Sequence, residues 1–151
     1  MRILGVDLGE RTLGLALSDP LGIVAGALQT IRRTSESKDL LALAGVMAEQ
    51  EVGEIVVGLP LNMNGTRGPQ AEKAETFARK LRERFGLPVH LWDERLSTVA
   101  AERSLLEADL SRKKRKQVID QVAAALFLQS FLDKRGQHSD AVPTMARKDE
   151  A

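Results

Sequence analysis

The sequence contains no cysteine and no tyrosine, and only two of its 151 residues are histidine. The absence of cysteine excludes disulfide bridges, thiolate catalysis and zinc–thiolate sites. The two histidines, His90 and His138, are too few for a multi-histidine metal centre. The chemistry left to this chain is therefore that of carboxylates, backbone amides and the cations of Arg and Lys.

Long apolar runs and an excess of one charge are missing as well. The apolar run from Val122 to Leu128 is far shorter than the ~20 residues that span a bilayer. Charged residues interrupt the N-terminal segment too early for a signal peptide. Lys and Arg (22) almost balance Asp and Glu (21), so no overall basic field points to nucleic acid. We therefore expect a cytoplasmic protein without a membrane partner.

Five strands and four helices are predicted from the periodicity of the apolar residues. The strands at 2–6, 12–18 and 22–31 have very short connections, which favours an antiparallel meander. The other strands are expected at 54–59 and 88–92. Helices are expected from the cap Ser37 to Ala48, from Pro69 to about Gly86, from Ser97 or Thr98 to about Ala108, and from about Gln117 to Lys134.

This order of elements predicts an α/β fold. A three-stranded meander followed by two right-handed crossovers gives a five-stranded mixed sheet with helices on both faces and strand order 3-2-1-4-5. That is the ribonuclease H-like (RNase H-like) layout. The length allows one domain, which we place at 1–135, and we expect the polar tail at 136–151 to be disordered.

Asp7 ends the first strand, whose other residues predict a central, buried position. A carboxylate at such a position requires a cation, hydrogen bonds or an open edge of the sheet. Gly9 follows closely and, because it lacks a Cβ atom, lets another backbone or a phosphate approach. The alternative is a strand-end aspartate that accepts hydrogen bonds from turn amides.

Glu94 follows the fifth strand in the segment WDERLST. Parallel crossovers bring the ends of strands one, four and five to one edge of the sheet. Strand five lies roughly 10 Å from strand one, and Gly58 on the intervening strand leaves room for a glutamate to reach across. The alternative for Glu94 is a surface contact with Arg95 or a helix cap, and Asp93 competes for any functional role.

Asp120 lies on the last helix, at the edge of its buried arc. An acid near a helix N-terminus is favourable in any case, and Lys116 precedes it by one turn. Three acids that converge on one sheet edge are nevertheless hard to explain separately. The apolar residues that define the arc, or align with Asp120, are Ile119, Val122, Ala123, Leu126, Phe127 and Phe131.

Converging carboxylates without His or Cys suit the hard cations Mg²⁺ and Mn²⁺. Two such ions can activate a water molecule and stabilise the leaving oxygen of a phosphodiester. We therefore expect Asp7, Glu94 and Asp120 to be both catalytic residues and metal ligands.

Two segments are candidates for contacts with phosphates. Five consecutive basic residues precede the Asp120 helix, and without them 17 basic residues face 21 acidic ones, a balance of −4. A solvated charge run is the alternative. The other segment is the loop around Gly65, whose free amides at a helix start can hold an anion. With 3% aromatic residues, stacking is limited to Trp92, and backbone contacts should dominate. The predicted nucleic-acid-binding residues are Thr66, Arg67, Gly68, Arg95, Arg112, Lys113, Lys114, Arg115 and Lys116.

The chain resembles the YqgF family of Holliday junction resolvase-like proteins in GVDLGERTLGLALSD, VVGLPLNMNGTRG, WDERLST and IDQVAAALFLQ. The resemblance covers residues 2–133, and it implies an RNase H-like fold, divalent-metal-dependent nuclease activity and a role in maturing small-subunit ribosomal RNA. The acidic positions that it carries over are Asp7, Glu94 and Asp120. Related resolvases place an acid at the end of strand four, where this chain has Gly58.

The expected function is therefore that of a Mg²⁺- or Mn²⁺-dependent hydrolase, a nuclease that processes pre-16S rRNA in ribosome biogenesis. RNA is favoured over DNA as its partner, ribosomal particles are further partners, and the chain is expected to be a monomer or a homodimer. Two alternatives stay open: a Holliday junction or DNA nuclease in recombination and repair, and a non-catalytic rRNA-binding module. A phosphotransferase of the sugar-kinase type is a third, although that fold ordinarily needs two such domains.

Overall fold

The computed structural model of the chain describes residues 1–99 and 112–141. Three strands come first, and helices and strands then alternate, as the sequence predicts. The elements are β1 Arg2–Leu8, β2 Thr12–Ser18, β3 Ala25–Arg32, α1 Glu36–Glu49, β4 Val52–Leu59, α2 Pro69–Phe85, β5 Val89–Asp93, the 3-10 turn η1 Glu94–Leu96, and α4 Arg112–Ala141.

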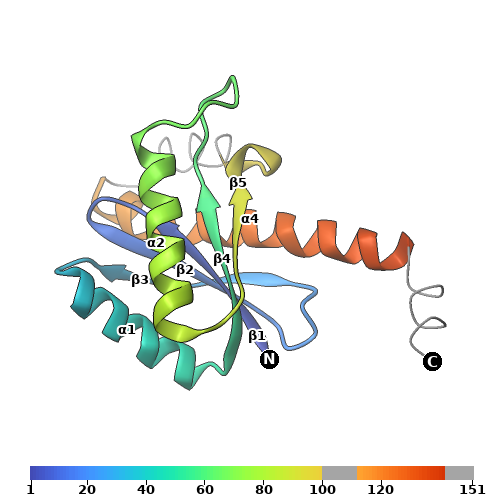
Figure 1. Cartoon of the computed structure of the whole chain (residues 1–151), viewed down its shortest axis with the longest axis horizontal. Helices are drawn as coiled ribbons and strands as arrows, with labels where there is room; N and C mark the ends of the chain where they lie inside the picture. Colours follow the sequence, from blue (N-terminus) through green and yellow to red (C-terminus); the bar gives the residue numbers. More distant parts are fainter. Residues whose placement is uncertain (100–111, 142–151) are drawn as a thin grey trace.

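The five strands form one mixed sheet in the order β3-β2-β1-β4-β5, which confirms the predicted order (Figure 1). β2 pairs antiparallel with both β1 and β3, because the connecting turns are too short for a crossover. β4 pairs in parallel with both β1 and β5, through crossovers that contain α1 and α2. β1 is therefore central, and the ends of β1, β4 and β5 meet at one edge.

One apolar layer covers each face of the sheet. The layer under α1 and α2 is mostly aliphatic and includes Leu4 and Val6 of β1. The layer under α4 includes Ile3 of β1 and the ring of Phe127. Successive side chains of a strand point to opposite faces, so Asp7 belongs with Ile3 to the face that α4 covers. We call the two sides the α1/α2 face and the α4 face.

The N-cap of α1 is Ser35 and not the predicted Ser37. The hydroxyl of Ser35 accepts a hydrogen bond from the Lys38 backbone N–H. Both serines are suitable N-cap residues, and the local hydrogen bonds of Asp39 favour the earlier one. Asp39 is buried and accepts a hydrogen bond from the Thr34 backbone N–H, which fixes the chain just before the helix.

The ends of α2 are those that the sequence predicts. Gly68 is the N-cap and Pro69 stands in the first turn, where a missing N–H costs nothing. The helix ends at Gly86, whose φ of 64° lies in the left-handed region that favours glycine. The residues of α2 that face the core are Ala71, Ala74, Phe77, Ala78 and Leu81, and all of them are buried.

The range 117–134 predicted for the last helix is too short at both ends, because α4 spans Arg112–Ala141. The basic run 112–116 is therefore part of the helix and not a segment ahead of it, in keeping with the high helix propensity of Arg and Lys. Just past the predicted end of the helix at Lys134, Arg135 donates a hydrogen bond to Glu54 of β4 at 2.9 Å. This bond holds the C-terminal part of the helix to the sheet.

The buried face of α4 is rotated relative to the prediction. Val122 and Leu126 are only half-buried, whereas Leu128 is fully buried. The cause lies in the sheet: a Cβ atom at Gly5 would stand 3.1 Å from Leu128 Cβ, so the helix packs directly on the glycine backbone. Asp120 is consequently in line with the buried face. The buried residues of α4 are Ala123, Ala124, Phe127, Leu128, Phe131 and Leu132.

Two predictions fall largely outside the described residues: the helix expected from Ser97 or Thr98 to about Ala108, and the end of the polar tail at 142–151. Ser97 itself accepts a hydrogen bond from the Val99 backbone N–H at 3.4 Å. Among the described helices, none has the length and apolar character needed to cross a membrane.

Candidate active site

Asp7 is the penultimate residue of β1, and only 5% of its surface is exposed. It lies directly opposite Gly14 of β2 in the antiparallel register. Its neighbour Val6 pairs with Val57 of β4, so Gly58, the next residue of β4, flanks Asp7 on the other side. The buried carboxylate is thus bordered by a glycine on each neighbouring strand, which leaves space on the α4 face for groups from elsewhere in the chain.

Asp120 stands over the first of these glycines. A Cβ atom at Gly14 would lie 2.2 Å from the carbonyl carbon and oxygen of Asp120, so only glycine admits the helix here. The carboxylate of Asp120 is held by Thr12, whose Oγ1 donates a hydrogen bond to Oδ2. A Cβ atom at Gly9 would lie 3.7 Å from the same oxygen. The Asp120 side chain therefore lies against the turn that follows Asp7.

Glu94 begins η1, directly after β5. Its Oε2 lies 3.1 Å from the point where a Cβ atom of Gly58 would stand. The ring of Phe127 approaches the same point to 2.7 Å and packs beside the carboxylate. The glutamate therefore reaches from β5 over β4, on the face of the sheet to which Asp7 belongs.

The three acids share one edge and one face of the sheet. Because facing Cβ atoms of neighbouring strands are about 5 Å apart, Asp120 Cβ and Glu94 Oε2 each lie within about 8 Å of Asp7 Cβ. Nevertheless, the described part of the chain holds no group of three or more His, Asp or Glu side chains arranged to hold a metal ion. As a donor set the three carboxylates fit a hard divalent cation, but their side chains would have to turn toward one another to share it.

Asp93, the competing acid, is engaged with Arg95. Its carboxylate accepts hydrogen bonds from the Arg95 guanidinium at 2.8 Å and 3.1 Å and from the Arg95 backbone N–H at 2.9 Å. The side-chain hydrogen bonds from Arg95 hold the pKa of Asp93 below its usual value, although burial opposes this shift. Asp93 is also the N-cap of η1, so it orients the turn that carries Glu94.

Arg95, predicted to contact phosphates, lies against the loop that leads to the predicted residues 66–68. Arg95 Nη1 donates a hydrogen bond to the Met63 carbonyl at 3.3 Å, which ties the loop to η1. Within the loop, Arg67 forms an ion pair with Glu75 at 2.6 Å. The other predicted set, the basic run 112–116, forms the first turns of α4, so a single helix carries both this run and Asp120.

Sequence reasoning missed three residues that shape the site: Thr12, Gly14 and Arg33. Arg33 Nη1 donates a hydrogen bond to the Gly9 carbonyl at 2.7 Å, and its Nε lies 3.2 Å from the carboxylate of buried Asp39. Gly14 could have been found by counting outward from the hairpin turn, because that count places it opposite the strand-end acid. Thr12 and Arg33 carry no such signal, since their contacts depend on how distant segments pack.

The chain is closely similar in sequence to known proteins. A family model described as "RuvX: Holliday junction resolvase" matches residues 1–134. A protein of Moorella thermoacetica named "Putative pre-16S rRNA nuclease" is 59% identical over 138 residues, which cover 91% of this chain and 99% of the relative. A protein of the same name from Myxococcus xanthus is 57% identical over 133 residues, which cover 88% of each chain.

Two solved structures share the fold. RuvC of Thermus thermophilus, in complex with a Holliday junction substrate, has a TM-score of 0.56 at 16% identity, over 89% of this chain and 96% of RuvC. The fowlpox virus Holliday junction resolvase has a TM-score of 0.52 at 12% identity, over 89% of this chain and 99% of its own. These likenesses concern the fold alone, and they confirm the RNase H-like expectation. With its motifs, its sheet order and the family match over residues 1–134 in agreement, the chain belongs to the RuvX (YqgF) family of Holliday junction resolvases.

Proposed function

We propose that the chain is a divalent-metal-dependent nuclease that hydrolyses phosphodiester bonds of structured RNA, with the precursor of 16S rRNA as its substrate. The observation that carries this proposal is the convergence of carboxylates from β1, η1 and α4 on one edge and one face of the sheet. The names of relatives at 59% and 57% identity support the choice of substrate. That substrate implies the cytoplasm as location and ribosomal particles as partners.

Asp7, Glu94 and Asp120 are the residues that would hold Mg²⁺ or Mn²⁺. Such an ion, when bound, supplies activation of the attacking water and stabilisation of the leaving oxygen. The chain's own contribution is to position the ligands. Asp7 sits on the central strand, Thr12 orients the carboxylate of Asp120 by its hydrogen bond, and the cap made by Asp93 fixes the turn that carries Glu94.

The phosphate backbone would be contacted from two sides of this edge. On one side are Arg95 and the loop Thr66–Gly68, and on the other is the run Arg112–Lys116. The side chains of Arg67 and Arg95 are 57% and 41% exposed, and both are in ion pairs. Because ion pairs of exposed side chains contribute little to stability, these arginines can exchange a carboxylate for a phosphate.

Two other functions are each favoured by one observation. A non-catalytic RNA-binding module is favoured because the described residues hold no ready-made group of three metal-ligating side chains. A DNA nuclease that cleaves branched junctions is favoured by the description of the matching family. Both make predictions that a single assay separates from those of an RNA nuclease.

The test is a cleavage assay with precursor rRNA, single-stranded RNA, single-stranded DNA and a four-way DNA junction, each with Mg²⁺, with Mn²⁺ and with EDTA. We expect metal-dependent cleavage that is fastest on the precursor rRNA. Asp7→Asn and Asp120→Asn should each reduce cleavage at least about 100-fold, the scale of losing one charge-stabilising group, with RNA binding largely intact. Asp133→Asn, at an exposed position on the same helix as Asp120, is the matched control and should cleave like wild type.

The possible outcomes distinguish the three functions. Tight RNA binding without cleavage, unaffected by EDTA and by both active-site substitutions, would establish the binding module. Cleavage confined to the four-way junction would establish the DNA nuclease. Undiminished cleavage by Asp7→Asn or Asp120→Asn would remove the proposed site whatever the substrate.

A further inference from the structure

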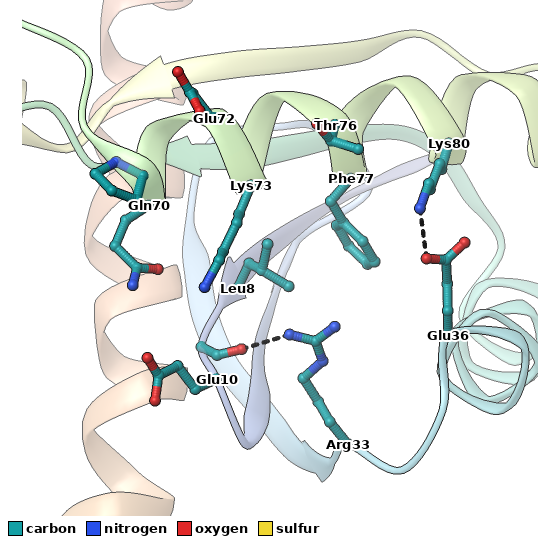
Figure 2. A pocket seen from close by; sticks show the side chains of 12 residues that line it. Leu8, Glu10, Arg33, Glu36, Gln70, Glu72, Lys73, Thr76, Phe77 and Lys80 are labelled. Carbon is teal, nitrogen blue, oxygen red and sulfur yellow. Dashed lines mark hydrogen bonds and ion pairs between the residues drawn. The ribbon is translucent and has the colours of Figure 1, made fainter.

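A cavity of about 720 Å³ lies between α1, α2 and the β1–β2 turn, on the opposite side of the sheet from α4 (Figure 2). Its volume falls in the range of ~300–1,000 Å³ typical of small-ligand sites. Its apolar lining comes from Leu8, Pro69 and Phe77. At one end the ion pair of Lys80 and Glu36, 2.5 Å apart, joins α2 to α1. We call this space the α1/α2 cavity.

Gly9 connects the cavity to the edge that carries the acids. It lines the cavity, and the point where its Cβ atom would stand lies 3.7 Å from Asp120 Oδ2. The Gly9 carbonyl accepts a hydrogen bond from Arg33 Nη1, and the carboxylate of Asp39 holds the Arg33 guanidinium in turn. The turn is therefore fixed in place, and Gly9 alone separates the cavity from the carboxylate of Asp120. Because the Thr12 carbonyl oxygen lies 3.0 Å from the Cβ position of Gly9, a strand that leads from the acids to the cavity has to pass over the outside of the turn.

Lys73 supplies a cation that forms no pair with any residue the structure describes. Figure 2 shows its side chain running from α2 toward Leu8 and the β1–β2 turn, with Gln70 nearby. Lys80 and Arg33, the other cations of the cavity, are paired with carboxylates. Lys73 has no hydrogen bond or ion pair with any described residue. An ammonium group beside an apolar surface can bind the phosphate of a nucleotide whose base packs on that surface.

The acids of the cavity limit this use without preventing it. Glu36 is neutralised by Lys80, and Figure 2 shows Glu72 pointing away from the space. Glu10, on the turn itself, has no ion pair with any described residue. Its charge should therefore weaken the binding of a phosphate by repulsion. Removal of the Glu10 charge should raise the affinity for nucleic acid, whereas removal of the Lys73 charge should lower it.

We propose that the α1/α2 cavity binds a single-stranded segment of nucleic acid that continues from the cleaved bond, with Lys73 contacting a backbone phosphate. The direction of the strand rests on the proposed function. The contact itself does not, because phosphate binding by Lys73 requires neither a metal ion nor cleavage. The cavity thus extends the substrate site around the β1–β2 turn to the other face of the sheet.

The experiment measures the binding of a labelled single-stranded RNA oligonucleotide by fluorescence anisotropy, in EDTA and over a range of salt concentrations. Lys73→Met removes the charge and keeps the apolar stem, so we expect the affinity to fall about 5- to 10-fold and the salt slope to drop by about 0.7, the value for one phosphate contact. Arg79→Met, at an exposed position of α2 outside the cavity, is the matched control and should retain the wild-type slope. Glu10→Gln should raise the affinity, and thermal unfolding confirms that each variant is folded.

Equal losses in Lys73→Met and Arg79→Met would reveal a general attraction to the charge of α2 and overturn the proposal, as would a wild-type slope in Lys73→Met. Cleavage assays separate this result from the proposed function. Lys73→Met should raise KM for the oligonucleotide and leave the cleavage of bis(p-nitrophenyl) phosphate, a diester too small to reach the cavity, unchanged. If wild type shows no cleavage while Lys73→Met still loses affinity and slope, the proposed function fails and the cavity assignment stands.

Discussion

The two faces of the sheet pack against their helices in different ways. On the α1/α2 face, aliphatic side chains of the strands meet those of the helices, and Leu43 and Leu81 are fully buried between them. On the α4 face the strands contribute Gly5, Gly14 and Gly58, and a Cβ atom at any of them would crowd α4 or its side chains. The first face packs through side chains of the strands, whereas on the second the three glycines also let α4 approach the strand backbone. The candidate active site lies on the second, because a helix that touches strand backbone brings a carboxylate next to a central strand.

The largest effect is expected from adding volume to the α4 face. In Gly14→Ala the new methyl group would meet the Asp120 backbone at 2.2 Å, and a backbone cannot move aside by a rotamer change. The helix would have to shift, so we expect a loss of about 3 kcal/mol in the free energy of unfolding together with loss of metal-dependent cleavage. Gly26→Ala, in the same hairpin with no atom within 4 Å of the added carbon, is the control. Equal stabilities of the two variants would contradict the close approach of α4.

Removing volume should be the damaging change on the other face. Leu43→Ala should lower the free energy of unfolding by roughly 3 kcal/mol, because it leaves a cavity in a fully buried layer. Cleavage per folded molecule should not change. Leu41→Ala is the matched control on α1, because Leu41 is 65% exposed. Its substitution should cost less than about 0.5 kcal/mol, as chemical denaturation will show.

The comparison can be sharpened at the hydrogen bond between Thr12 and Asp120. Thr12→Val keeps the shape of the side chain and removes the donor, so we expect about a 10-fold loss of cleavage, the kinetic equivalent of one hydrogen bond to a charged group. A loss that acts through the metal site should raise the Mg²⁺ concentration needed for half-maximal rate. Thr12→Ser restores the hydroxyl and should restore both quantities. A serine variant as impaired as the valine variant would assign Thr12 a packing role only.

The smallest effect is expected at the far end of the α4 face, where Arg135 and His90 contact Glu54. The hydrogen bond from Arg135 lowers the pKa of Glu54 below its ordinary value of 4.5; burial opposes this shift and the hydrogen bond with His90 adds to it. Because the folded-state pKa is the lower one, the contact is fully stabilising above 4.5 and is lost as the pH falls through the lowered value.

Glu54→Gln should therefore cost at most about 1 kcal/mol near neutral pH, and less in acid. Denaturant unfolding of wild type and variant on both sides of the ordinary pKa measures the difference. A difference in stability that does not shrink in acid would show that the ion pair is not its source.

The predictions that succeeded share one physical feature: each depends on a local rule or on chain connectivity. Pro69 and Gly86 bound α2 because their backbone preferences act on their own residues. The start of α1 and both ends of α4 were wrong. At α1, Ser35 and Ser37 both satisfy the local rule. The contact of Asp39 with Thr34 selects the start of α1, and Arg135 extends α4 by pairing with a strand distant in sequence.

The sequence by itself determined the order of the elements and with it the strand order, because short connections and right-handed crossovers leave few topologies open. It also determined that Asp7 stands at the end of one strand and Glu94 directly after another, and that both strands end at one edge of the sheet. Only the tertiary structure decided how α4 lies on the sheet, that Thr12 holds Asp120, and that Gly9 joins the acid edge to a cavity on the other face. The reason is that a glycine in a strand shows that no side chain occupies the position, but it does not identify the group that packs there. That group is decided by the packing of segments more than 100 residues apart.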